Sequence, residues 1–481
     1  MITAAFALVP AAPALAALVL LGPIRRDALV ARVTLLALAG SASALAIAAA
    51  LGGDRIAVFA GGAAVVLAAL VAAFATRAIH GGTTPYRRFF ATLLFAAAGA
   101  LGVAVASDLR WLAFAWIGTG IATSALLAVA PGAAARQWAF RHARVEAIGD
   151  LAWIVLLVVV GRTYGTFDLH AIGTAIAPGT PAVVIACAIV AAGAARSVLL
   201  PLHAWLPNSM EAPTPVSAFM HAGLVNGAGV LFAKCAPLVA AAPGVLVAVG
   251  VLGGLTALYG AWMSAVRPEA KRRLGWSTVA QMGWMTLQCG CGAFAAALVH
   301  LAAHGGYKAS RFLGVAGTVV ESRRARERGL RRARRAPVAT AFFALAVPSA
   351  GVGFAFAAAH EELLRLPAHS AVAALAWMTG VVAARAMADT VLDLPARIAG
   401  AAAVAGGVGA YLLAATALDR WLGAALPHVD VPVLPPLVAA LAVASGLLRA
   451  SGVRTALARP LRDRLYVFAL TEGRAIAGGA R

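Results

Sequence analysis

Long apolar runs recur along the whole chain, and they constrain its fold more than any other feature. A transmembrane helix needs about 20 mostly apolar residues. Fifteen such runs lie near 4–22, 28–52, 56–76, 89–107, 110–130, 148–167, 181–199, 212–240, 243–266, 273–291, 293–319, 337–359, 368–390, 396–416 and 431–450. They predict an all-α, polytopic membrane protein with about 13–15 transmembrane helices, some of them discontinuous.

The composition excludes a water-soluble fold. Hydrophobic residues make up 62% of the 481 residues and charged residues 12%, and the mean hydropathy is +0.89. Soluble domains are about 45–50% apolar and about 25% charged. No basic residue precedes the first apolar run and further runs follow it, so we expect a retained span there rather than a cleaved signal peptide.

The basic residues are concentrated in alternate loops between the apolar runs. The chain carries 39 Lys and Arg against 18 Asp and Glu, a net charge of +21, and the predicted loop 321–336 contains SRRARERGLRRARR. Cytoplasmic loops of membrane proteins collect Lys and Arg. We therefore expect an outside N-terminus and a cytoplasmic C-terminus, with membrane lipids, and not nucleic acid, as partners of the basic segments.

The cysteines give no sign of a disulfide or metal framework. Cys187, Cys235, Cys289 and Cys291 lie inside apolar runs and lack CxxC spacing. We expect all four to be buried small hydrophobic side chains. The sequence predicts no metal site in this chain.

A cluster of prolines interrupts the apolar region that follows Arg196. Each proline removes an amide donor, so one uninterrupted helix cannot form there. A broken helix is tolerated at membrane depth only where protein or water satisfies the freed backbone, and such breaks mark ion paths in transporters. A polar loop between two ordinary spans is the alternative. The four prolines are Pro201, Pro207, Pro213 and Pro215, with Glu211 among them.

His221 is a titratable side chain inside the span that follows this segment, and Asn226 lies further along the same span. A lone histidine on an apolar helix is often a packed core residue. Its ordinary pKa near 6.5 also allows proton exchange near neutrality. Both a structural role and a proton relay are therefore open for His221.

His300, His304 and Lys308 follow an i, i+4, i+8 spacing, which places them on one stripe of a helix. Ionisable groups inside membrane helices are costly and indicate function. Zinc is one possible ligand of a His pair at i, i+4. No Cys, Asp or Glu shares the stripe and no HExxH motif is present, so the pattern favours a proton wire.

Other charged residues in the apolar runs are weaker candidates. Asp150 lies near the start of the predicted span 148–167, and Arg385 with Asp389 forms an i, i+4 pair. Arg311 belongs to the end of a helix or to the polar interior. Structural ion pairing and transport are equally open for these residues.

Several motifs resemble a known superfamily. RSVLLPLHAWLPNSMEAPTPVSAFMHAGLVNGAGVL, KRRLGWSTVAQMGWM and HLAAHGGYKASRFL are similar to the proton-conducting antiporter-type subunits of respiratory complex I and of multisubunit sodium/proton antiporters. WIGTGIATSALL, MGWMTLQCGCGAFAAALVHLAAHGGYKA and EAPTPVSAFMHAGLVNG look closer to DabB, the membrane subunit of the DAB inorganic-carbon transporters. The resemblance covers an antiporter-like core at 85–320. N-terminal transmembrane helices (1–84) precede this core, and it is followed by the basic cytoplasmic loop 321–336, C-terminal transmembrane helices (337–452) and a basic cytoplasmic tail (453–481).

The resemblance implies that the segment from Arg196 to Pro215 belongs to a discontinuous helix, and that His221 and the histidine–lysine stripe lie on a central axis that carries protons. It also implies a hetero-oligomer in the bacterial inner membrane, with a DabA-type peripheral subunit that binds zinc and resembles a β-carbonic anhydrase. This chain would then be a transporter subunit without a cofactor and not an enzyme. Protons or another cation would drive bicarbonate accumulation by the partner.

One motif departs from complex I. Its subunits carry a glutamate after the tryptophan of the fifth span and a lysine before the broken helix, whereas here Ile117 follows Trp116 and Arg196 takes the place of the lysine. Arginine stays protonated in proteins, so we expect a fixed positive charge rather than a switching pair. The departure fits the DAB subunit better than complex I.

Two other functions remain open from the sequence. A cation/proton antiporter subunit or a redox-linked pump subunit would use the same motifs. A simple membrane anchor for a peripheral enzyme would have no need of a stripe of titratable residues.

Overall fold

The computed structural model describes residues 1–22, 26–79, 85–209, 212–267, 269–314, 337–364, 367–389, 394–427, 429 and 431–451. Glu211, the predicted basic loop 321–336 and the predicted tail 453–481 lie outside these residues.

Helices make up most of the described residues, which contain no strand. The helices are α1 (Ile2–Leu21), α2 (Asp27–Ala50), α3 (Arg55–Ala78), α4 (Tyr86–Val105), α5 (Leu109–Leu127), α6 (Ala133–Tyr164), α7 (Leu169–Ala175), α8 (Thr180–Arg196), α9 (Trp205–Asn208), α10 (Thr214–Ala222), η1 (Leu224–Asn226), α11 (Gly227–Lys234), α12 (Ala236–Ala240), α13 (Pro243–Val266), α14 (Ala270–Gly290), α15 (Phe294–Leu313), α17 (Pro337–Leu364), α18 (Pro367–Ala388), α19 (Leu394–Leu422), η2 (Gly423–Ala425) and α20 (Leu434–Ser451).

The helices coincide with the predicted apolar runs, which confirms the all-α, polytopic fold. The run 212–240 is the exception to one helix per run, because it contains α10, η1, α11 and α12. Within the described residues, nine segments are long and apolar enough to cross a membrane. The predicted division between 291 and 293 is also confirmed, because the chain turns at Gly292 with φ 79°.

The predicted span 148–167 begins too late. α6 starts at Ala133 and runs for 32 residues, so Asp150 lies inside the helix and not near its start. The first half of α6 is rich in charged residues, and a search for apolar runs therefore misses it. Contacts with α5, α8 and α9 allow this polar half to continue the helix.

The prediction that all four cysteines are buried is wrong for Cys187. This side chain is exposed on α8, whereas Cys235, Cys289 and Cys291 are buried, and all four are free thiols. A thiol on the outer surface of a membrane helix needs no burial in protein, because lipid is itself an apolar environment.

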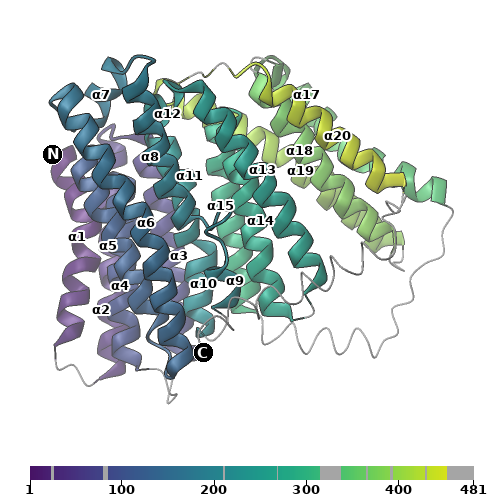
Figure 1. Ribbon diagram of the computed structural model, residues 1–481. Coiled ribbons are helices and arrows are strands. Elements are labelled where there is room, and N and C mark those ends of the chain that lie inside the picture. Colours follow the sequence, from purple (N-terminus) through teal and green to yellow (C-terminus); the bar gives the residue numbers. More distant parts are fainter. Residues whose placement is uncertain are drawn as a thin grey trace, which may run out of the picture.

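α15 is the central helix of the bundle. It packs against α3, α10, α11, α14 and α19. In Figure 1 the helices α1 to α8 occupy the left of the molecule, α9 to α15 its middle, and α17 to α20 lean across the upper right. Side chains on α15 are therefore surrounded by helices from both halves of the chain.

The start of α5 is fixed by Asp108, outside the apolar span. Its Oδ1 atom accepts a hydrogen bond of 2.8 Å from the backbone N–H of Arg110, as expected of an N-cap residue. The Arg110 side chain also donates to this carboxylate, and this hydrogen bond holds the pKa of Asp108 below its ordinary value. The cap sets the register of the helix that carries Trp116.

Glycines bring α13 and α14 into close contact. A Cβ atom at Gly283 would overlap the backbone of Ala257, and one at Gly260 would overlap the backbone of Ala280. Small residues at such interfaces let membrane helices approach closely. The pair α13–α14 forms the most extensive helix contact in the described structure.

We predict that Gly283→Ala lowers the free energy of unfolding by about 1–3 kcal/mol, because the added methyl forces the backbones of α13 and α14 apart. The measurement is the thermal midpoint of the purified protein in detergent. Gly254→Ala on α13 is the matched control, since nothing lies within 4 Å of the position of its Cβ. Equal midpoints for the two variants would contradict the close packing.

Candidate functional site

The histidine–lysine stripe of α15, which comprises His300, His304 and Lys308, faces the interior of the bundle. His304 is 5% exposed and Lys308 is 1% exposed, while His300 is partly buried. Charged or titratable side chains at such depth must find partners within the protein. The partners come from α14, η1 and α19.

Lys308 is held by α14. Its Nζ atom donates hydrogen bonds to the carbonyl oxygen of Leu274 at 2.8 Å and to the hydroxyl of Ser277. No ion pair with a carboxylate is formed by Lys308 in the described structure. A lysine that is solvated by neutral acceptors alone is a suitable group to take up and release a proton.

His221 on α10 lies against α14 and α15. Its Nδ1 atom is 3.1 Å from Oγ1 of Thr278, and the Thr278 hydroxyl donates to the carbonyl oxygen of Leu274 at 3.0 Å. The hydroxyl of Thr278 therefore links His221 to the backbone of α14. The buried Nε2 atom of His221 has no hydrogen-bond partner, and the ring stacks on Phe312 at 4.4 Å.

His304 contacts the break between α10 and α11. Its Nδ1 atom is 3.2 Å from Oδ1 of Asn226, whose Nδ2 atom donates to the carbonyl oxygen of Ala222 at 2.6 Å. The amide orientation makes Nδ1 of His304 the donor. Its Nε2 atom is buried without a partner, so His221 and His304 each keep one ring nitrogen without a hydrogen bond.

His300 lies between two glutamine side chains of α14. Its Nε2 atom is 2.7 Å from Oε1 of Gln281, and its Nδ1 atom is 3.1 Å from Oε1 of Gln288. Gln288 in turn donates to the hydroxyl of Tyr411 on α19 at 2.6 Å. The rings of His300 and His304 are 6.3 Å apart, so the stripe forms a continuous polar row.

The proline-rich segment is a buried interruption of helical structure. α8 ends at Arg196, Val198 takes a positive φ of 49°, and the Leu200–Pro201 peptide is cis. The other three prolines occupy short or starting helices: Pro207 lies in α9, Pro213 is the N-cap of α10, and Pro215 lies in the first turn of α10.

Side chains satisfy the backbone at these breaks. The Ser197 hydroxyl accepts a hydrogen bond of 2.9 Å from the N–H of Ala228 and donates to the carbonyl oxygen of Val225. Lys271 donates to the carbonyl oxygen of Ala212 at 2.7 Å. Such internal partners are what non-helical backbone requires at membrane depth.

Arg196 forms a buried ion pair with Glu146 on α6. The Arg196 Nε atom donates to Glu146 Oε2 at 2.8 Å, and the Nη2 atom lies 2.7 Å from the same oxygen. Nη2 also donates to the carbonyl oxygen of Trp116 at 2.8 Å, and the guanidinium lies 4.4 Å from the centre of the Trp116 ring. Arg196 is 3% exposed and Glu146 is also buried.

The carboxylate that pairs with Arg196 comes from Glu146 on α6, and not from position 117 on α5, which is an isoleucine. Gly120 on α5 faces the ion pair, and a Cβ atom there would be 3.1 Å from Glu146 Oε2. The sequence interpretation did not identify Glu146 or its neighbour His142, because it placed both in a loop before the span. Their i, i+4 spacing with Asp150 at i+8 is the signal that could have revealed them.

The remaining predicted residues lie away from the stripe. Asp389 is 3.5 Å from Arg385, and its side chain is 48% exposed at the end of α18. Arg311 is exposed on the last turn of α15. These three residues therefore belong to helix ends and not to the central row.

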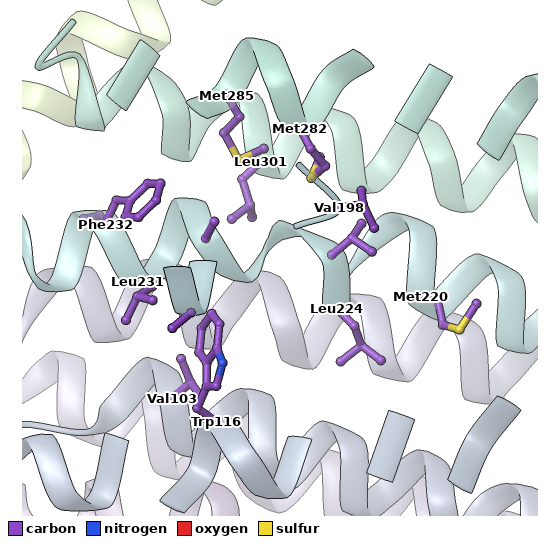
Figure 2. Close-up of a cluster of buried hydrophobic side chains, with 14 of the residues drawn as sticks. Val103, Trp116, Val198, Met220, Leu224, Leu231, Phe232, Met282, Met285 and Leu301 are labelled. Carbon is purple, nitrogen blue, oxygen red and sulfur yellow. The ribbon is translucent and has the colours of Figure 1, made fainter. Parts of the chain in front are cut away.

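A cavity of about 520 Å³ lies beside the Arg196–Glu146 ion pair and Asn226. Arg196 and Asn226 line it together with mainly apolar residues of α3, α5, α10 and α15. Figure 2 shows the apolar cluster in this region, with Trp116 on one side and Met285 and Leu301 on the other. The cavity thus touches the ion pair and the hydrogen-bond partner of His304.

No third ligand turns the His300–His304 pair into a metal site. Within the described stretches, no group of three or more His, Cys, Asp or Glu side chains is placed to hold a metal ion. The stripe is surrounded instead by hydroxyl, amide and carbonyl groups, which exchange hydrogen bonds with titratable side chains.

Comparison with known proteins identifies relatives of this chain. The chain is 38% identical over 248 residues to the probable inorganic carbon transporter subunit DabB1 of Halothiobacillus neapolitanus, which covers 50% of this chain and 44% of the relative. It is 36% identical over 274 residues to NADH-quinone oxidoreductase subunit L of Mycobacterium tuberculosis, covering 54% of this chain and 42% of the relative. The alignments thus span less than half of these curated relatives.

A solved structure extends the similarity of the fold to nearly the whole chain. The Mrp complex from Dietzia sp. contains a chain that superposes with a TM-score of 0.60 at 24% identity, over 99% of this chain and 55% of that one. The model of the NADH:quinone oxidoreductase/Mrp antiporter transmembrane family matches residues 106–353, more than half of the sequence and all of α15. The chain therefore belongs to the NADH:quinone oxidoreductase/Mrp antiporter transmembrane family.

Proposed function

We propose that this membrane protein is the proton-conducting subunit of an energy-coupled inorganic-carbon pump. Protons, or another cation, pass along its central polar row and drive bicarbonate accumulation by a peripheral zinc subunit of the DabA type. The similarity to DabB1 supports the carbon substrate. The buried stripe of α15 is the observation that carries the proposal of conduction.

The stripe has the properties that a proton path requires. Lys308 and His304 are buried among neutral hydrogen-bond partners, and His221 and His304 each hold a ring nitrogen without a partner. Because a buried unpaired polar atom is costly, water or a transferred proton would complete the hydrogen bonding of these nitrogens. The row from Lys308 to His300 then serves as the middle of the path.

The end of the path next to His300 continues toward α18 and α19. A cavity of about 30 Å³ is lined by Ala296, Thr416, Asp419 and His369. Ala296 lies one turn before His300 on α15. One water needs about 10–15 Å³ of such space, so the cavity can hold a water beside the Asp419 carboxylate, about one helical turn from His300.

Arg196 acts as a fixed charge in this proposal. The guanidinium stays protonated and is neutralised by Glu146 at 2.7 Å. A lysine in its place could release its proton, but arginine instead sets a constant potential beside the cavity. The ion pair therefore shapes the energy of protons on neighbouring groups without carrying them itself.

The membrane potential supplies enough energy for the coupling. One elementary charge that crosses 100 mV releases about 2.3 kcal/mol, which corresponds to a roughly 40-fold change in an equilibrium constant. In the proposed complex this energy biases hydration of CO2 on the cytoplasmic partner. The chain takes an orientation with the N-terminus outside and lies in the bacterial inner membrane as part of a hetero-oligomer.

A cation/proton antiporter or redox-driven pump subunit is the second candidate. The 36% identity to subunit L of an NADH-quinone oxidoreductase favours it. The same polar row would then be coupled to sodium or potassium exchange or to a redox partner. Transport that depends on sodium or potassium, and not on a zinc subunit, would establish this alternative.

We predict that Lys308→Ala abolishes carbon-dependent growth rescue, because it removes a fully buried titratable group from the path. The measurement is growth at ambient CO2 of a bacterium without carbonic anhydrase that expresses this chain with its neighbouring subunit. The complex should remain assembled after purification. Arg311→Ala is the control, since Arg311 is exposed on the same helix. Full rescue by Lys308→Ala would overturn the proposed path.

We predict that growth rescue by the wild-type complex disappears with a protonophore and persists without added sodium. The physical reason is that the proton gradient, and not a sodium gradient, drives the pump. The measurement is uptake of labelled inorganic carbon with and without each ion gradient. Uptake that is unchanged by the protonophore would contradict proton coupling and would support a role of this chain as a membrane anchor only.

We predict that Glu146→Gln destabilises the protein by about 3–5 kcal/mol, because it leaves Arg196 buried without a counter-charge. The double variant Glu146→Gln/Arg196→Gln should recover most of this loss but not proton flux. The measurements are the thermal midpoint in detergent and flux into vesicles. Wild-type flux in the double variant would show that the ion pair is only structural.

A further inference from the structure

α6 carries a second stripe of titratable side chains with the spacing of the α15 stripe. His142, Glu146 and Asp150 occupy positions i, i+4 and i+8. His142 is fully buried, Glu146 is 3% exposed, and Asp150 is half-buried. The path described above assigns no proton to any of these three groups.

A proton can bind between His142 Nε2 and Glu146 Oε1, because these two atoms face each other. The Nδ1 atom of His142 is 2.7 Å from Ser124 Oγ, and this hydroxyl also lies 3.1 Å from the carbonyl oxygen of Gly120. The Nε2 atom of His142 faces Oε1 of Glu146 at 3.4 Å. Neither atom has another hydrogen-bond partner, and a proton on Nε2 removes the repulsion between two acceptors.

Asp150 extends this pattern by one helical turn. Its Oδ1 atom is buried without a hydrogen-bond partner. The charges that act on the Asp150 carboxylate are those of Glu146, Arg196 and His142. From the elements packed against α6, Arg196 at the end of α8 is the charged group that faces Glu146, while α5 presents Ser124 and α9 presents Trp205.

Charge balance limits where the proton of this cluster can be. Arg196 is always positive, and a hydrogen bond from its Nε atom together with the ion pair of its Nη2 atom holds Glu146 in the ionised form. These two charges cancel. The cluster is then neutral either with a doubly protonated His142 and an ionised Asp150, or with a neutral His142 and a protonated Asp150. A net charge at this depth would be costly.

We propose that this cluster holds one exchangeable proton, which resides either on His142 or on Asp150, so that the α6 stripe is a second proton-transfer site beside Arg196. An N–H bond breaks when the proton leaves His142, and an O–H bond forms when Asp150 takes up a proton, so that the net charge of the four groups returns to zero. His142 takes the titrating role that arginine cannot take. This inference rests on the proposed function for its direction, but not for the proton balance itself.

The first test uses variants that keep hydrogen bonding and remove titration. His142→Gln can still donate to Glu146, and Asp150→Asn keeps the shape of its side chain. Removing a positioned proton-transfer group costs about 10²–10⁴ in rate in enzymes, so we expect each variant to lower proton flux at least roughly tenfold. His170→Gln on α7 is the control because His170 is exposed. The measurement is voltage-driven proton uptake by vesicles that contain the full complex.

The second test follows the proton balance directly and works even where transport fails. In Asp150→Asn, nitrogen-15 NMR of labelled histidine should show His142 as a neutral ring with one nitrogen protonated. In His142→Gln, infrared spectroscopy should show a protonated carboxylic acid that the added substitution Asp150→Asn removes. Both results together support the proposal. A His142 ring that stays doubly protonated in Asp150→Asn overturns it.

The two tests separate this inference from the function. Wild-type flux in His142→Gln and Asp150→Asn overturns the second transfer site, while loss of flux in Lys308→Ala still supports the α15 path. Conversely, wild-type flux in Lys308→Ala together with the expected loss in His142→Gln overturns the α15 path and keeps the α6 site.

Discussion

The burial of a permanent positive charge is the constraint on which this structure depends. Arg196 cannot lose its proton, so the fold must provide a carboxylate at the same depth, and α6 brings Glu146 to 2.7 Å from it. The carbonyl oxygen and ring of Trp116 complete the surroundings of the guanidinium. Three helices, α5, α6 and α8, are held in register by this one cation.

The same constraint explains the interrupted helices. Backbone groups that leave a helix inside the membrane region need partners. The Ser197 hydroxyl provides them at the break between α10 and α11, for the carbonyl oxygen of Val225 and the N–H of Ala228. The interruption also contains the buried Asn226, which contacts His304. The cost of broken backbone is therefore offset by side chains that also order the polar row, and structure and proposed transport share the same hydrogen bonds.

The sequence predicted the α15 stripe and failed on the α6 stripe for one reason. His300, His304 and Lys308 interrupt a long apolar run, and so they stand out against it. His142 and Glu146 lie in the polar first half of α6, which resembles a loop when only hydropathy is considered. Periodicity at i, i+4 and i+8 was present in both segments. The two stripes differ in their surroundings, because α8 places Arg196 against the stripe of α6.

Composition and apolar periodicity by themselves determined the all-α membrane fold, the number of long helices and the polar face of α15, because these depend on local sequence over one helix length. Tertiary structure alone decided the partners: Glu146 for Arg196, Asn226 for His304, and Gln288 with Tyr411 for His300. These pairs join residues from different helices, up to 123 positions apart along the chain. Hydropathy contains no information on such distances, because a buried charge selects its partner by proximity in space.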